Sequence, residues 1–121
     1  MLQTKNRVQS FKYAGNGLKH AFYTQTNFQI QLTVAFVVLI LAVFFKFTRA
    51  EWLILIITIG LVLVAELLNT VIEVVVDLAV QEQLLPEAKI AKDVSAAAVL
   101  LLSLISVIVG LILFLPHLFT F

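Results

Sequence analysis

Three apolar stretches, each long enough to cross a lipid bilayer, constrain this chain more than any other feature. They cover about residues 28–45, 52–76 and 94–115. A hydrocarbon core about 30 Å thick needs about 20 apolar helical residues for each crossing. Since 62% of the residues are hydrophobic and the mean hydropathy is +1.10, a water-soluble domain is excluded. We expect one all-α integral membrane domain over residues 1–121, with three transmembrane helices.

A short amphipathic helix is expected to precede the first span. Over residues 8–24, Phe11 and Leu18 fall on one helical face, whereas Lys12 and Lys19 fall on another. A basic helix of this kind lies on the membrane surface, where it acts as an anchor or contacts substrate. About 27 mixed polar residues precede the first span and no small-residue cleavage site follows it, so we do not expect a signal peptide.

The distribution of Lys and Arg predicts the orientation in the membrane. Six of the eight flank the N-terminal side of the first span or lie between the second and third spans, and two lie in the other loop. The excess places the N-terminus in the cytoplasm. The formal net charge of +1 gives no field that would attract nucleic acid, and the lack of cysteine excludes thiolate metal sites. The six are Lys5, Arg7, Lys12, Lys19, Lys89 and Lys92, and the two are Lys46 and Arg49.

A row of polar side chains interrupts the second span. Glu66, Asn69, Glu73 and Asp77 lie within about 80° of one another on an α-helix. Counting about 1.5 Å per residue from Trp52 places Glu66 about 21 Å into the bilayer. A charge at that depth costs about 2.5–3.5 kcal/mol on insertion scales, so Glu66 should face protein or water. The two outer acids suit Mg²⁺ and Glu66 suits a general base for a lipid hydroxyl; alternatively, the row holds helices together by hydrogen bonds.

Charged residues also precede the third span. A lysine such as Lys92 beside a helix N-terminus suits a phosphate group. Alternatively, Lys92 extends toward water from the apolar helix and Asp93 caps the helix. Pro116 is expected to end this helix. Together with the acids, the lysines indicate phosphoryl transfer at a membrane surface, although the chain has neither a Walker A nor a GxGxxG motif.

Two segments resemble the prokaryotic diacylglycerol kinase family: AELLNTVIEVVVD at residues 65–77 and AKDVSAAAV at residues 91–99. The segments at residues 11–19 and 84–93 look more similar to the undecaprenol kinases of Gram-positive bacteria than to the enterobacterial branch. The resemblance implies a homotrimer in the bacterial cytoplasmic membrane, with composite sites between subunits. It also implies transfer of the γ-phosphate of ATP to a lipid alcohol, diacylglycerol or undecaprenol, with Mg²⁺.

The resemblance also implies roles for individual residues. The family usually has a metal-binding glutamate where this chain has Gln25, whose amide carries no charge, so metal binding is expected to be weaker. This departure leaves open a catalytically weakened member that binds nucleotide or lipid. A small proton-coupled transporter that uses Glu66 as a relay is a third alternative. By position, Glu66 would be the proton acceptor, Glu73 a metal ligand, Asn69 and Lys19 contacts to the acceptor, and Tyr13, Asp77, Lys92 and Asp93 the ATP-binding residues.

Overall fold

The computed structural model describes residues 6–119, and this part of the chain is all-helical. Four helices follow one another, and the last three are each long and apolar enough to cross a membrane. The fold class is therefore confirmed. Lys5, one of the basic residues used to predict orientation, lies outside the described residues. The helices are α1 (Arg7–Thr24), α2 (Thr26–Phe44), α3 (Arg49–Val80) and α4 (Pro86–Phe119).

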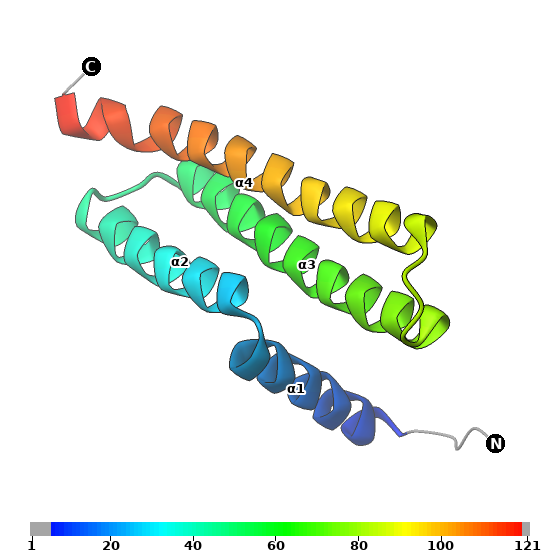
Figure 1. The fold of residues 1–121 in the computed structure, drawn as a ribbon. Coiled ribbons are helices and arrows are strands. Elements are labelled where there is room, and N and C mark those ends of the chain that lie inside the picture. Colours follow the sequence, from blue (N-terminus) through cyan, green and yellow to red (C-terminus); the bar gives the residue numbers. More distant parts are fainter. Residues whose placement is uncertain (1–5, 120–121) are drawn as a thin grey trace.

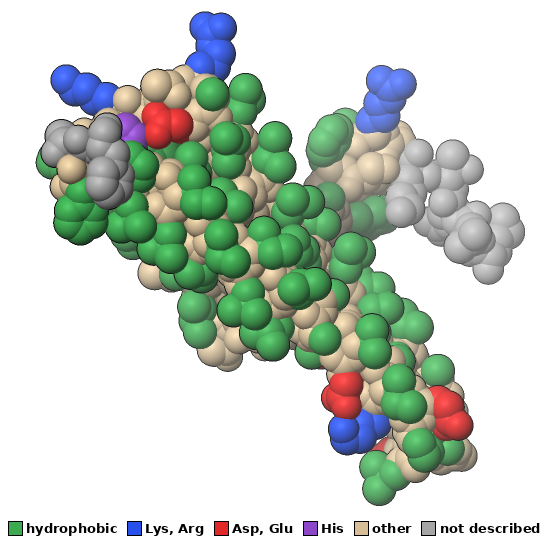
Figure 2. Space-filling model, turned by 90° about the horizontal axis from the view of Figure 1, so that it is seen from above, with side chains coloured by type: hydrophobic (Ala, Val, Ile, Leu, Met, Phe, Trp, Pro, Cys, Tyr) green, Lys and Arg blue, Asp and Glu red, His purple; other side chains and the backbone are tan. Residues whose placement is uncertain are grey.

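Helices α3 and α4 form an antiparallel pair, and α2 lies beside α3 (Figure 1). Helix α1 continues from α2 toward the end of the molecule that also holds the α3–α4 turn (Figure 1). Hydrophobic side chains cover the length of the molecule, and charged side chains gather at its two ends (Figure 2). This distribution suits a bundle whose middle lies in hydrocarbon and whose ends lie in water.

Local capping explains where two of the helices begin. The Asn6 side chain accepts a hydrogen bond from the backbone N–H of Gln9, and the Gln9 side chain accepts one from the backbone N–H of Asn6. Thr48 and Glu51 form the same reciprocal arrangement at the start of α3. Each pair satisfies backbone donors that a helix leaves free in its first turn.

Helices α3 and α4 are longer than the spans predicted from hydropathy. They contain 32 and 34 residues, or about 48 and 51 Å, so each extends well beyond a hydrocarbon core of about 30 Å. Because α4 begins at Pro86, Asp93 lies inside the helix and the expectation that it caps the helix is wrong. Proline is favoured in the first helical turn because its missing N–H has no helical partner there.

The prediction that Pro116 ends the last helix is also wrong, since α4 continues through it to Phe119. Tertiary contacts hold this final turn. His117 Nε2 lies 2.6 Å from Glu51 Oε2 at the start of α3, and the Phe47 ring stacks on the His117 ring with centroids 5.0 Å apart. Phe47 belongs to a small buried cluster with Ala42, Leu55 and Leu113. These contacts compensate for the hydrogen bond that proline removes.

Candidate functional site

Glu66 is the innermost residue of the polar row on α3, and it is buried. Only 1% of its surface is exposed, and it is the largest completely enclosed side chain among the described residues. Its Oε2 atom has no hydrogen-bond partner among residues 6–119. A buried acceptor without a donor is costly, so a group from outside the described chain is needed to satisfy it. The structure therefore agrees with the expectation that Glu66 does not face acyl chains.

Asn69 lies one turn farther along α3 and is 6% exposed. Its Nδ2 donates to Glu73 Oε1 at 3.1 Å, which orients the amide and leaves Oδ1 buried without a partner. Two buried oxygen acceptors, one from Glu66 and one from Asn69, thus lie on successive turns of the same helix. Such a pair can accept a hydrogen bond from a substrate hydroxyl or coordinate a hard cation.

An ion pair connects the outer end of this row to α4. Lys92 Nζ lies 2.5 Å from Asp77 Oδ1, and both side chains remain partly exposed. On α4 itself, Lys89 Nζ lies 2.6 Å from Asp93 Oδ2. The structure thus brings Lys92 opposite the acidic row, but not beside a helix N-terminus. The free N–H groups of α4 belong to the turn that starts at Pro86, so the predicted phosphate cradle from that terminus is wrong.

Gln25 lies at the junction of α1 and α2. Its backbone N–H donates to the Ala21 carbonyl at 2.9 Å, and its Nε2 donates to Thr24 Oγ1 at 3.3 Å. Both bonds hold the junction itself. Over residues 6–119, no group of three or more His, Cys, Asp or Glu side chains lies close enough together to hold a metal ion by itself.

Helix α1 contacts α2 and lies across a groove from a different face of α3. An apolar groove of about 690 Å³ separates α1 from α3, and Ala14, Gly17 and Ala21 line it from the α1 side. At 100° per residue, Lys19 falls on the side of α1 that is turned away from this groove, and Tyr13 falls at its flank. Within one subunit, therefore, the structure gathers the predicted residues of α3 and α4, and it leaves Lys19 of α1 apart.

Gln31 is a polar residue of the first span that sequence analysis did not assign to a site. Its Oε1 atom is also buried without a partner, and its side chain lines a cavity between α2, α3 and α4. A glutamine beside the apolar run of the first span could have marked Gln31 as a candidate binding residue. The sequence pattern does not show how the three helices pack, so it could not predict that Gln31 lines a cavity between them.

Comparison with known proteins places the chain in a family. The pattern of the prokaryotic diacylglycerol kinase family matches residues 12–114. An undecaprenol kinase of Bacillus subtilis is 42% identical over 110 residues, which cover 91% of this chain and 89% of that relative. A diacylglycerol kinase of Synechocystis is 43% identical over 93% of this chain and 65% of that relative.

A third relative extends the similarity to another bacterial group. A diacylglycerol kinase of Haemophilus influenzae is 32% identical over 107 residues, which cover 88% of this chain and 91% of that relative. The family pattern covers both the polar row of α3 and the start of α4. The resemblance stated from the sequence is thus confirmed. This chain belongs to the prokaryotic diacylglycerol kinase family.

Proposed function

We propose that this chain transfers the γ-phosphate of ATP to the hydroxyl of a lipid alcohol, with Glu66 as the proton acceptor. Family membership makes the chain a membrane lipid kinase with ATP as phosphate donor. One observation carries the assignment of Glu66: a fully enclosed carboxylate on a membrane-spanning helix has an oxygen without a protein partner. An alcohol hydroxyl is a donor that would satisfy it.

The proposed step moves one proton and one phosphoryl group. The lipid O–H donates to Glu66 Oε2, which takes the proton as the alcohol oxygen bonds to the γ-phosphorus. The bond from that phosphorus to the bridging oxygen breaks, and ADP leaves. Asn69 and Lys19 would contact the acceptor. Lys92 would exchange its bond to Asp77 for the phosphates of ATP, with Asp77, Asp93 and Tyr13 bordering the nucleotide.

A substitution that keeps the shape of Glu66 tests the proposal. Glu66→Gln removes the proton acceptor, and we expect phosphorylation of diacylglycerol or undecaprenol to fall about 10²- to 10⁴-fold. Glu87→Gln, in the exposed first turn of α4, is the matched control and should keep full activity. Transfer that survives Glu66→Gln would remove Glu66 as the base. If the unaltered chain binds ATP but phosphorylates no lipid alcohol, the result would favour the alternative of a catalytically weakened family member.

We also propose that Mg²⁺ acts in this site. The donor set fits, because Mg²⁺ is usually held by one or two carboxylates together with substrate phosphates, and the Glu73 carboxylate lies beside the unpartnered Oδ1 of Asn69. Glu73 would hold the ion, Gln25 would supply a neutral oxygen, and the ion would neutralise charge on the phosphates. Gln25→Glu should lower the Mg²⁺ concentration needed for half-maximal ATP binding. An unchanged Mg²⁺ requirement would place Gln25 outside the site.

The proposed acceptor is a lipid alcohol, and the names of the relatives suggest two classes of it. One relative is named undecaprenol kinase and two are named diacylglycerol kinase. We propose that this chain acts on one of these two classes. Measuring phosphate transfer to each in the same vesicles would decide between them. The uncharged Gln25 is the observation that favours the alternative of a weakened enzyme, and the same assay tests it.

We propose a single domain that forms a homotrimer, with the N-terminus and the α3–α4 turn in the bacterial cytoplasm. The start of α1 and the α3–α4 turn lie toward the same end of the molecule (Figure 1), and the excess of Lys and Arg favours that side. Since the chain has no cysteine, single cysteines can report orientation. In intact cells an impermeant maleimide should label Lys46→Cys and spare Glu82→Cys; the opposite pattern would reverse the assignment.

A further inference from the structure

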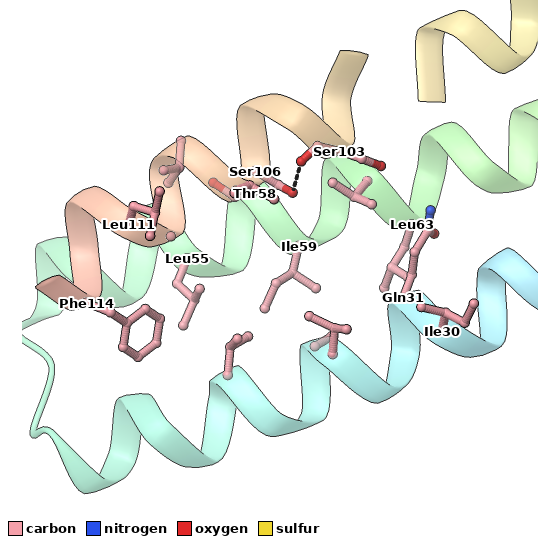
Figure 3. Close-up of a pocket in the computed structure, with 17 residues that line it drawn as sticks. Ile30, Gln31, Leu55, Thr58, Ile59, Leu63, Ser103, Ser106, Leu111 and Phe114 are labelled. Carbon is pink, nitrogen blue, oxygen red and sulfur yellow. Dashed lines mark hydrogen bonds between the residues drawn. The ribbon is translucent and has the colours of Figure 1, made fainter. Parts of the chain in front are cut away.

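A second cavity lies inside the bundle, on the side of α3 that faces α2 and α4. It has a volume of about 460 Å³, within the range of about 300–1,000 Å³ that is usual for small-molecule sites. Figure 3 shows Leu55 and Ile59 pointing into it from α3, with Phe114 at one end and Gln31 near the other. We call this space the bundle groove.

The walls of the bundle groove are apolar, although three hydroxyl-bearing residues line it. Thr58 Oγ1 donates to the Ile54 carbonyl at 2.7 Å, and Ser106 Oγ donates to the Ser103 carbonyl at 2.7 Å. The Thr58 and Ser106 hydroxyls therefore donate within their own helices. The polar exception is Gln31 Oε1, buried without a partner. A ligand with a long hydrocarbon part and a polar group at one end matches this lining.

The bundle groove continues the face of α3 that carries the polar row. At 100° per residue, Leu55, Ile59 and Val62 lie within about 60° of one another and centre on the direction of Glu66. The groove thus begins about one turn from Glu66 and runs away from the acidic end. A molecule with its hydroxyl at Glu66 would have its hydrocarbon chain aligned with the groove.

We propose that the bundle groove binds one hydrocarbon chain of the lipid acceptor and that Phe114 limits the length of that chain which the groove buries. The inference rests on the proposed function, because Glu66 fixes where the hydroxyl lies. Phe114 is held in place by aromatic contacts at the outer end, where its ring centroid lies 4.8 Å from that of Phe47 and 6.2 Å from that of Phe45. A chain that fills the groove therefore meets a supported ring.

The helix geometry gives the expected length. Leu55 lies eleven residues before Glu66, or about 16 Å along α3. An extended hydrocarbon chain advances about 1.3 Å per carbon, given bonds of about 1.5 Å, so the groove and its approach hold about 12 carbons. Each further methylene that stays buried strengthens binding by roughly four-fold, and one that meets Phe114 gains nothing.

Filling the groove tests the proposal without disturbing the protein. A Cβ atom at Gly110 would meet nothing within 4 Å, and Gly110 lines the groove. Gly110→Leu should raise the KM for long-chain glycerol monoesters at least roughly ten-fold, since it displaces two or more methylenes. Gly60→Leu is the matched control, because Gly60 on α3 is equally open but does not line the groove. It should leave the KM unchanged; equal effects of the two variants would overturn the proposal.

Lengthening the groove should have the opposite effect. With saturated glycerol monoesters of graded chain length, binding to the unaltered chain should stop improving near about 12 carbons. In Phe114→Ala, the limit should move to longer chains. Phe36→Ala is the control, because Phe36 is 67% exposed on α2 and faces away from the groove. A limit that stays in place in a folded Phe114→Ala protein would contradict the role of Phe114.

Photo-crosslinking separates this inference from the proposed function. A glycerol monoester with a diazirine at the end of its chain should label peptides around Leu111 and Phe114, and Gly110→Leu should abolish the labelling. Labelling without phosphorylation of any lipid alcohol would support the groove and refute the kinase proposal. Phosphorylation with labels only on outward-facing residues, or crosslinks from Gly110→Cys to a second copy of the chain, would refute the groove as a lipid site.

Discussion

The pair formed by Asp77 and Lys92 is placed where it contributes little to stability. Their side chains are 63% and 41% exposed, and exposed ion pairs are worth about 0–1 kcal/mol. The pair nevertheless links α3 to α4 at the end of the row that begins with Glu66. Because the ion pair is weak, Lys92 can exchange Asp77 for an incoming phosphate at little energetic cost.

The weakness of this ion pair leads to a prediction for Lys92. Lys92→Met should change the free energy of unfolding by less than about 1 kcal/mol but raise the KM for ATP by about ten-fold or more, since a charged contact to phosphate is lost. Lys89→Met removes a comparable exposed pair with Asp93 and should leave the KM nearly unchanged. Steady-state kinetics and unfolding in the same detergent measure both quantities. Equal changes in KM for the two variants would contradict a specific role for Lys92.

At the scale of single helices, hydropathy and periodicity predicted which elements form because both are local properties. The end of α4 depended on a contact that is distant in sequence. His117 and Glu51 are 66 residues apart, and nothing in either segment indicates that they meet. Without this contact the sequence predicts an end at Pro116, whereas α4 continues to Phe119. Its start at Pro86, and not near residue 94, was missed because residues 86–93 are rich in charged residues and hydropathy does not detect them.

The start of α3, where it meets the end of α4, allows a prediction about helix ends. Thr48→Ala removes one side-chain cap of α3 and should cost about 1 kcal/mol. Glu51→Ala removes the reciprocal bond to Thr48 and the contact with His117, and should cost roughly 2 kcal/mol. His117→Ala leaves the cap intact and should account for the difference. Loss of helical circular dichroism on denaturant titration measures the three values. A larger effect of Thr48→Ala than of Glu51→Ala would contradict the role of the distant contact.

In the molecule as a whole, one chain supplies only part of the proposed site. Glu66, Asn69 and Glu73 lie on one helix, and α4 brings Lys92 to the same row through Asp77. The sequence predicted this part because residues at helical spacing share a face. Lys19, in contrast, faces away from α3 within its own chain. If it contacts the acceptor as we propose, it does so in a neighbouring subunit.

Mixing inactive variants tests this division of the site. When Glu66→Gln and Lys19→Ala chains are co-expressed, about a quarter of the sites in a random ring of subunits combine an intact Glu66 with an intact Lys19 from a neighbour. Activity should return to about that fraction. Glu66→Gln mixed with Lys92→Met should recover much less, because Lys92 pairs with Asp77 of its own chain and the same chain then has to supply Glu66. Equal recovery in both mixtures would show that α4, like α1, contributes to the site of a neighbouring subunit.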